Sequence, residues 1–209
     1  AVFTPSAHWS HHVALHYTYG YGYYAELKPN YKFSKFGLTY YDRDGNFVKR
    51  SDFIRKKGLS QNTYGLVYNA NYKDDEWDVV GGLNLQQFRG SHFGYLTYIA
   101  NEDANAKYRA NGNYQYYDSK ARKNDYSAFI KATLHLSQSW DMFGDVQYRH
   151  VGYKTDGKND KFYAQPDGTY KNQILDINAN YNFVNPKAGI SYHQDGHRAY
   201  FSVAYASRE

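Results

Sequence analysis

The stretch that decides the fold is residues 11–26, HHVALHYTYGYGYYAE, in which two chemical classes of side chain alternate. The odd positions, mostly apolar or aromatic, are His11, Val13, Leu15, Tyr17, Tyr19, Tyr21, Tyr23 and Ala25. The even positions, mostly polar or small, are His12, Ala14, His16, Thr18, Gly20, Gly22, Tyr24 and Glu26. Because successive side chains of a strand point to opposite faces, this period of two predicts a β-strand with one apolar and one polar face.

The same alternation recurs along the chain and predicts seven long strands, at residues 11–26, 60–72, 76–88, 125–136, 140–153, 173–193 and 197–207. Most are longer than the strands of globular proteins, which have about 5 or 6 residues, and long enough for a tilted strand to cross a bilayer, which takes about 9 to 11. Within residues 173–193 the apolar positions change from odd to even after Asn185. A β-bulge at residues 184–186 is therefore predicted, because it would keep the apolar side chains on the same face of the sheet.

The links between these segments alternate between short and long. Residues 73–76, 137–139 and 194–196 are predicted tight turns, whereas residues 27–59, 88–124 and 154–172 are predicted long polar loops. Short turns at one end and long loops at the other are typical of outer-membrane barrels, as are the aromatic residues near the segment ends. The sequence therefore predicts an all-β, antiparallel up-and-down meander of about seven long strands that forms part of a larger transmembrane β-barrel.

The composition excludes several other classes. The chain has 209 residues, of which 26 are Tyr, 12 Phe and 3 Trp, and such an aromatic content argues against disorder. No run of about 20 apolar residues is present that could form a transmembrane helix. The absence of cysteine excludes disulfides, thiol nucleophiles and cysteine zinc sites. A net charge of +5 permits an acidic partner without requiring one.

The predicted strand count indicates an incomplete barrel. Bacterial barrels have an even number of strands, from 8 upward, and the last segment stops at Ser207-Arg208-Glu209 without a terminal aromatic residue. The numbering also starts without an initiator methionine or an apolar leader segment. We therefore expect residues 1–209 to be one partial barrel domain of a longer protein.

Two neighbouring motifs near the end of the chain resemble a known family. Residues 185–192, NPKAGISY, and residues 198–209, RAYFSVAYASRE, resemble a recurrent mid-barrel hairpin of TonB-dependent outer-membrane receptors. The likeness extends to residues 22–24, 52–59, 92–95 and 144–150, and it looks closest to the receptors of Bacteroides-type bacteria. No single motif is specific, but together they run over nearly the whole chain.

The resemblance implies a barrel of roughly 22 strands with an N-terminal plug, which imports a scarce nutrient across the bacterial outer membrane with energy delivered by TonB. The plug, the TonB-contacting segment and the C-terminal assembly strand have no counterpart in this sequence. The implied partners are outer-membrane lipid and lipopolysaccharide, TonB through the missing plug region, and a small nutrient ligand. The nutrient of such a receptor could be siderophore-bound iron, haem, cobalamin or an oligosaccharide.

A function of another class stays open on the sequence alone. Alternation also fits a soluble or surface-exposed β-rich module that binds a ligand or carbohydrate, with its apolar face packed inside. A barrel enzyme of the outer membrane, using Ser127, Asp145 or His150, is a weaker alternative. A receptor fragment would need lipid or detergent to cover its apolar face, whereas a soluble module would bury that face itself.

Basic and aromatic residues of the predicted loops are the candidate ligand-binding residues. They are Arg50, Arg55, Lys56 and Lys57 on the first long loop, and Arg89, His92, Tyr95 and Arg109 on the second. Their charges would attract an anionic ligand such as a ferric siderophore. Solvated loop charge, or pairing with lipopolysaccharide phosphates, explains the same pattern. The many aromatic residues of the second loop could stack on a ligand or pack against one another.

Two patterns suggest a metal ion, and each has a simpler explanation. His8, His12 and His16 share one strand face, but every fourth residue of a strand is about 13 Å away, too far to share one ion. Residues 42–46, DRDGN, look like the start of a calcium loop, but the position of the required glutamate is occupied by Phe53. We expect polar barrel residues and a tight turn instead, and no metal site.

No catalytic arrangement stands out. The sequence has no Gly-x-Ser-x-Gly motif and no glycine-rich phosphate loop. Asp141 and Asp145 are about 13 Å apart on one strand, beyond the carboxyl spacing of glycosidases. Basic loop residues and strand aromatics share no surface that could bind nucleic acid. We therefore expect no enzyme activity, no cofactor and no nucleic-acid partner.

Overall fold

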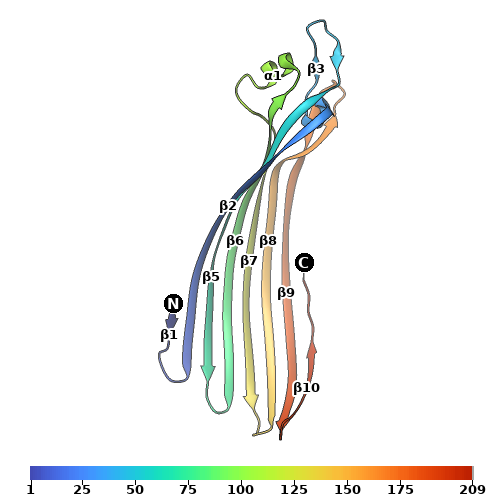
Figure 1. The fold of residues 1–209 in the computed structure, drawn as a ribbon. Coiled ribbons are helices and arrows are strands. Elements are labelled where there is room, and N and C mark those ends of the chain that lie inside the picture. The colour runs from blue at the N-terminus through green and yellow to red at the C-terminus, as the bar shows by residue number, and fades with distance from the viewer. Residues whose placement is uncertain (209) are drawn as a thin grey trace.

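The computed structural model describes residues 1–208, which form one long, curved antiparallel sheet with a small cap at one end (Figure 1). The sheet has the order β1-β2-β5-β6-β7-β8-β9-β10. Its strands are β1 (Val2–Phe3), β2 (Trp9–Lys32), β5 (Arg50–Lys73), β6 (Trp77–Ile99), β7 (Tyr114–His135), β8 (Trp140–Ala164), β9 (Tyr170–Gln194) and β10 (His197–Ala204). Each strand of this sheet pairs with the member of the sheet that follows it in the chain. This order confirms the predicted all-β meander. Glu209, the last residue of the hairpin motif, lies outside the described residues.

The predicted tight turns are confirmed, and they lie at one end of the sheet (Figure 1). Between β5 and β6, the Asp74 carboxylate accepts the backbone N–H groups of Glu76 and Trp77 at 2.9 and 2.7 Å. Between β9 and β10, Asp195 and Gly196 have φ angles of 48° and 79°. Positive φ at both central residues is the geometry of a two-residue hairpin, whose twist matches that of the strands.

The predicted long loops are wrong over most of their length. β2 continues to Lys32 and β5 begins at Arg50, so the link between them is residues 33–49 rather than 27–59. The other two links at this end are residues 100–113 and 165–169. Hydropathy alternates only where the two faces of a strand meet different surroundings, whereas backbone pairing continues past that boundary with polar residues on both faces. The sequence pattern therefore marked the amphipathic part of each strand and not its end.

A contact between distant strands shows which face of the sheet is concave. Lys57 of β5 and Asp160 of β8 form an ion pair at 2.5 Å, although β6 and β7 lie between their strands. Neighbouring strands are about 4.8 Å apart, so a flat sheet would hold these side chains much farther from each other. The sheet therefore curls toward the face that carries Lys57 and Asp160. We call this face concave and the opposite face convex.

The convex face carries an apolar band at the turn end of the six long strands, without Asp, Glu, Lys or Arg. By register, its residues are Trp9, His11, Val13, Leu15 and Tyr17 of β2; Tyr64, Leu66, Tyr68, Ala70 and Tyr72 of β5; Trp77, Val79, Gly81, Leu83 and Leu85 of β6; Tyr126, Ala128, Ile130, Ala132 and Leu134 of β7; Trp140, Met142, Gly144, Val146 and Tyr148 of β8; and Val184, Pro186, Ala188, Ile190 and Tyr192 of β9. Leu15 is 78% exposed, so this face is not covered by the chain itself. On each strand the band has the length that a tilted membrane strand needs, about 9 to 11 residues.

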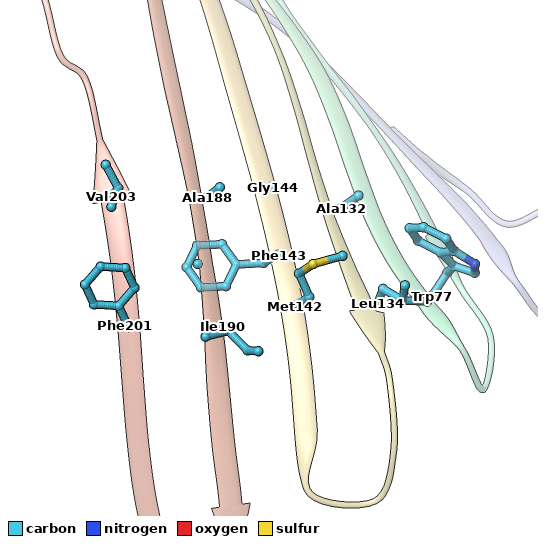
Figure 2. Close-up of a pocket in the computed structure, with 11 residues that line it drawn as sticks. Trp77, Ala132, Leu134, Met142, Phe143, Gly144, Ala188, Ile190, Phe201 and Val203 are labelled. Atoms are coloured by element: carbon cyan, nitrogen blue, oxygen red, sulfur yellow. The ribbon is translucent and has the colours of Figure 1, made fainter.

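Near the turns, the band is hollowed between β6 and β10. The hollow has a volume of 520 Å³ and is lined by apolar side chains that include Trp77, Leu134, Met142, Ile190 and Phe201 (Figure 2). Aromatic residues border the band on both sides, with Trp77 and Trp140 toward the turns and Tyr64 and Tyr126 toward the cap. Such aromatic rows are characteristic of membrane–water interfaces.

The predicted bulge at residues 184–186 is wrong. Val184 pairs with Tyr148 and Pro186 pairs with Val146 in an unbroken register. The apolar residues themselves change face. Val184 is exposed on the convex side, whereas the preceding residue, Phe183, is only 9% exposed on the concave side. Between Val184 and the cap the convex face of β9 is polar, and the apolar residues lie on its concave face instead. The register shifts that do occur in β2, β5, β6 and β8 all lie near the cap.

The cap contains the main buried cluster of the chain. It is built from η1 (Phe33–Phe36), β3 (Tyr40–Tyr41), β4 (Phe47–Val48) and α1 (Glu102–Tyr108), packed against the cap ends of the strands (Figure 1). The rings of Phe33 and Phe53 meet edge to face at 5.0 Å, and both side chains are almost fully buried. Tyr116 is 3% exposed and packs on Phe36 at 5.1 Å. Several of the second-loop aromatic residues therefore pack within the protein.

No helix in the described part of the chain, residues 1–208, is long and apolar enough to cross a membrane.

Candidate functional site

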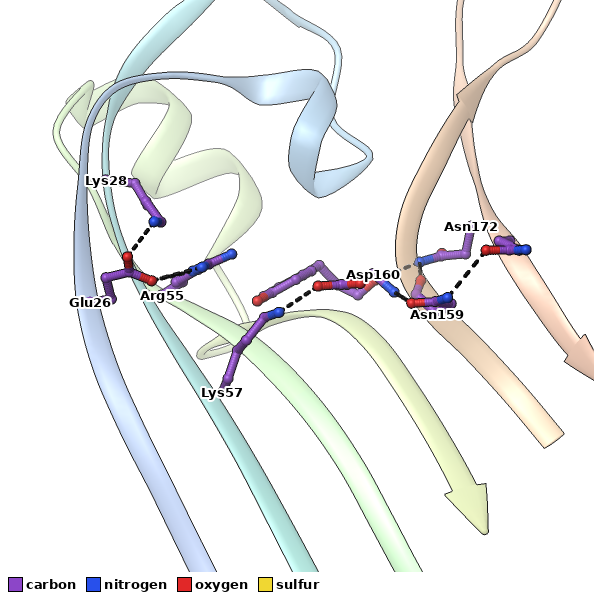
Figure 3. A network of polar contacts seen from close by, with 9 residues as sticks. Glu26, Lys28, Arg55, Lys57, Asn159, Asp160 and Asn172 are labelled. Carbon is purple, nitrogen blue, oxygen red and sulfur yellow. Dashed lines mark hydrogen bonds and ion pairs between the residues drawn. The ribbon is translucent and has the colours of Figure 1, made fainter. Parts of the chain in front are cut away.

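Charged side chains gather on the concave face just below the cap (Figure 3). β2 contributes Glu26 and Lys28, β5 contributes Arg55 and Lys57, and β8 contributes Asp160. Glu26 and Arg55 are direct cross-strand partners, and such pairs of opposite charge stabilise a sheet. We call this group, with the asparagines described below, the concave network.

Glu26 lies between two cations. The Arg55 guanidinium donates from Nε and Nη2 to Oε2 of Glu26 at 3.0 and 2.7 Å. Lys28 Nζ donates to the other carboxylate oxygen. These hydrogen bonds, from Lys28 first and then from Arg55, hold the pKa of Glu26 below its usual value. The group therefore carries one net positive charge on this side of the network.

Lys57 and Asp160 connect the two sides of the curved sheet. Lys57 Nζ also lies 5.5 Å from the centre of the Tyr117 ring, within range of a cation–π contact. The backbone N–H of Asp160 donates to the side-chain oxygen of Asn159 at 2.6 Å. Asn172 of β9 donates to the Asn159 carbonyl oxygen at 2.7 Å. The ion pair is thus fixed from both β8 and β9.

Two tyrosines place phenol groups beside this network. Burial, with the nearby Asp160 carboxylate as a further cause, raises the pKa of Tyr117 to about 12. Burial also raises the pKa of Tyr116, whose hydroxyl has no hydrogen-bond partner within residues 1–208. Both phenols are therefore neutral donors at neutral pH. Ammonium, guanidinium and phenol donors together suit an oxygen-rich anionic ligand.

The residues predicted as ligand-binding do not form a single site, and their expected loop location is wrong for all except Arg109. The other seven candidates lie on β5 and β6, because these strands extend far beyond their amphipathic parts. Arg55, Lys57 and His92 are on the concave face by register.

Lys56, Arg89 and Tyr95 are on the convex face. Lys56 Nζ stacks 3.6 Å above the Tyr23 ring. Whether any of these residues contacts a ligand stays a prediction.

The last two candidates lie at the cap. Arg50 Nη1 donates to the Asn30 carbonyl oxygen at 2.6 Å, across the start of β5. Arg109 follows α1 and donates to the side-chain oxygens of Asn105 and Asn113 at 3.0 and 3.1 Å. Both arginines therefore help to hold the cap together.

Sequence reasoning missed Glu26 and Asp160 as members of the site, and it included Tyr117 only among the second-loop aromatic residues that could stack on a ligand. Glu26 stands at the end of the alternating stretch, so continuing the register of β2 against β5 would have placed it opposite Arg55. Asp160 gave no such signal, because its contact with Lys57 depends on the curl of the whole sheet.

The two sequence patterns that suggested a metal ion have other structural roles. The Asp42 carboxylate accepts the backbone N–H groups of Asp44 and Asn46 at 3.0 and 2.8 Å, as a tight turn requires. His8 contacts the Lys73 carbonyl oxygen at 2.9 Å. Over residues 1–208, no group of three or more His, Asp or Glu side chains is placed to hold a metal ion.

Comparison with known proteins supports the architecture. No protein-family profile matches the sequence, and no curated protein sequence matches it. The crystal structure of the ferric-catecholate import receptor Fiu from E. coli K12, in an open form, matches with a TM-score of 0.57 and 13% sequence identity. The match covers 97% of this chain and 34% of that receptor, so the chain spans about a third of the receptor's length. The chain therefore has the fold of part of a receptor-like β-barrel.

Proposed function

We propose that the chain is part of the barrel wall of a TonB-dependent outer-membrane receptor that imports a scarce nutrient. The observation that carries this proposal is the separation of the two faces: an exposed apolar band on the convex side and a charged network on the concave side. Lipid would cover the first face, and a ligand passing through the barrel would meet the second. A soluble binding module would instead bury the apolar face, and Leu15 is 78% exposed.

Several features of the proposal lie outside the chain itself. The remaining strands, and the plug through which TonB acts, would belong to the rest of a longer protein. Lipid and lipopolysaccharide would surround the convex face in the outer membrane of a Bacteroides-type bacterium. Residues 1–209 would then be one section of a barrel domain.

An anionic iron complex is the first ligand to test. The similar solved structure is described as an importer of ferric catecholate, an oxygen-rich anionic ligand. Arg55, Lys57 and the neutral phenol of Tyr117 offer donors for such oxygens on the concave face. Haem, cobalamin and oligosaccharides are the competing ligands.

Uptake by the intact protein tests this function. The protein would be produced in cells that lack their own iron receptors, with and without TonB. Radiolabelled ferric catecholate, haem, cobalamin and an oligosaccharide would be supplied in turn. We expect TonB-dependent uptake of one of them, and extraction of the protein only with detergent. A protein that is a stable monomer without detergent, with Leu15 shielded from solvent, would contradict the proposal.

Lys57 and Lys56 provide a matched pair of variants, because they are adjacent in sequence and lie on opposite faces of β5. We expect Lys57→Gln to raise the half-saturating concentration of an anionic ligand about tenfold through lost electrostatic attraction, and Lys56→Gln to leave it unchanged. The double variant Lys57→Gln/Asp160→Asn controls for the loss of the ion pair itself. Equal effects of the two single variants would exclude the concave network from the ligand's route.

A further inference from the structure

A bulge in β8 carries Asp160 out of the regular sheet. By register, residues 159–161 of β8 stand opposite the single residue Gln173 of β9. A bulge bends its strand and re-aims a side chain, and bulges are common beside functional sites for this reason. The side chain that this bulge redirects is that of Asp160, which reaches Lys57 of β5 across two intervening strands (Figure 3).

Asn172 of β9 holds the bulge in place. Its side-chain amide donates to the backbone oxygens of Asn159 and Tyr116 at 2.7 and 2.8 Å, and it thereby ties the bulge to β7 as well as to β9. The side-chain oxygen of Asn159 in turn accepts the backbone N–H of Asp160 at 2.6 Å. Hydrogen bonds to the backbone therefore help to fix Asp160, in addition to its contact with Lys57.

Lys57 also belongs to a pocket on the concave face below the cap. The pocket has a volume of 490 Å³, and its lining residues include Gly22, Tyr24, Lys57, Leu59, His92 and Tyr117. A Cβ added at Gly22 would meet no atom within 4 Å, so the pocket is open beside β2. Lys57 supplies the ammonium group of this lining, and an anionic group in the pocket would bind there.

The Asp160 carboxylate occupies the position that such an anionic group would take. While the ion pair is closed, the charges of Lys57 and Asp160 cancel. If the pair opened, Lys57 would add a second positive charge to the one that Glu26, Lys28 and Arg55 leave. The side chains of Lys57 and Asp160 are 20% and 34% exposed, so both can be reached from the concave side.

We infer that Asp160, positioned by Asn172, is an internal competitor for the anion site at Lys57, and that a ligand binds in the pocket by replacing the Asp160 carboxylate with an anionic group of its own. This inference rests on the proposed function. If the ion pair is closed in about four of five molecules, the apparent dissociation constant is about five times the intrinsic one. A neutral ligand cannot replace the carboxylate, so Asp160 also selects anionic ligands over neutral ones.

Binding to the intact protein in detergent tests this exchange, with ferric catecholate as the probe and haem as a second anionic probe. Asp160→Asn removes the competing charge and keeps the size of the side chain, so it should lower the half-saturating concentration about fivefold. The control Asp156→Asn removes the same charge from the convex face of the same strand and should leave this concentration unchanged.

A double-mutant cycle separates competition from a general change of charge. In a Lys57→Gln background, Asp160→Asn should have almost no effect, because the group for which Asp160 competes is gone. An equal gain of affinity in both backgrounds would overturn the inference. So would an Asp160→Asn variant whose half-saturating concentration equals or exceeds that of the wild type.

The positioning role of Asn172 is tested through the reactivity of Lys57. Labelling of the intact protein with an amine-reactive ester, counted by mass spectrometry of the Lys57 peptide, reports how often the ion pair is open. Asp160→Asn and Asn172→Ala should both be labelled faster than the wild type, whereas Asn178→Ala, on the convex face of β9, should not. An Asn172→Ala variant with a lower unfolding temperature but unchanged labelling would show that Asn172 is only structural.

Uptake distinguishes this inference from the proposed function. A receptor that imports only cobalamin or an uncharged oligosaccharide would keep the proposed function and overturn the inference, because no anionic ligand would then bind at Lys57. A protein that imports none of the four ligands would contradict the proposed function itself. TonB-dependent uptake of ferric catecholate or haem, with a lower half-saturating concentration in Asp160→Asn, would support both.

Discussion

Lys56 and Lys57 follow one another in the sequence, yet they lie on opposite faces of β5. Lys57 pairs with Asp160 across the inside of the curve, while Lys56 stacks on Tyr23 outside it. The same basic residue type therefore serves different surroundings according to whether its position is odd or even. For this protein, the face on which a side chain lies says more about its role than its chemical type does.

The Glu26–Arg55 pair predicts a sensitivity to acid. Because hydrogen bonds lower the pKa of Glu26 in the folded state, its stabilising effect is complete above its ordinary value of 4.5 and is lost as the pH falls through the lowered folded pKa. We expect Arg55→Met to lower the unfolding temperature at neutral pH and to weaken the loss of stability below pH 4.5. Unfolding in detergent, followed by tryptophan fluorescence across this range, measures both effects.

A matched control for this prediction is Lys49→Met, at an exposed position away from the pair. It removes the same charge and should leave both the unfolding temperature and its acid dependence close to those of the wild type. If Arg55→Met and the wild type lost stability in parallel below pH 4.5, Glu26 would not be the group responsible.

Among the strands, several close contacts repeat one arrangement: a glycine lies directly opposite an aromatic residue of the next strand. Gly189 faces Phe143, Gly82 faces Phe129, and Gly58 faces Phe93. In each case the ring lies where a side chain on the glycine would be. An aromatic ring that covers a strand glycine compensates for the packing that the glycine lacks and helps to fix the register.

This arrangement predicts opposite effects for two alanine substitutions on neighbouring strands. A Cβ added at Gly189 would lie 2.5 Å from both the Phe143 ring and the Phe201 carbonyl oxygen, so Gly189→Ala should destabilise the protein by about 1–3 kcal/mol. A Cβ at Gly144 would meet nothing within 4 Å, so Gly144→Ala should be neutral or stabilise by about 0.4–1 kcal/mol. Chemical denaturation of both variants in the same detergent measures their free energies of unfolding. Equal changes in the two variants would show that the Phe143 ring does not restrict the space at Gly189.

The whole molecule places three environments along one set of strands. The convex band is apolar, the concave face is charged, and the cap has a buried aromatic core of its own. Because most of the long strands pass through all three, neither an average hydropathy nor one alternation pattern describes a whole strand. The mean hydropathy of −0.86 combines these parts and hides the band.

The membrane location of the band predicts a strong difference between two adjacent residues of β6. Leu83 lies within the convex band, one convex position from its middle, whereas Asn84 faces the concave side. An arginine facing lipid near the bilayer centre costs about 2–4 kcal/mol, so Leu83→Arg should destabilise the folded protein in lipid by that amount. Asn84→Arg should change stability by less than about 1 kcal/mol. Similar costs for both, measured by urea titration in vesicles, would show that the convex face does not meet lipid.

Alternation along the chain was enough to predict the antiparallel meander, the tight turns and the apolar face that contains Leu15. It was not enough to find the strand ends, because residues such as Lys28 and Arg55 continue the pairing without continuing the hydropathy pattern. The cap was also missed, since η1 and α1 are too short to show a helical period. Of the concave network, Arg55 and Lys57 were identified as candidates, but their partners were not.

What the sequence determined by itself is thus local: which residues alternate, which links are tight, and which strand face is apolar. These features follow from the period of two, which acts between residues close in the chain. Tertiary structure alone decided that Lys57 meets Asp160 and that β9 passes through its change of apolar positions in an unbroken register, without a bulge. Each of these depends on the register and curl of several strands together, and those are fixed only when the whole sheet has formed.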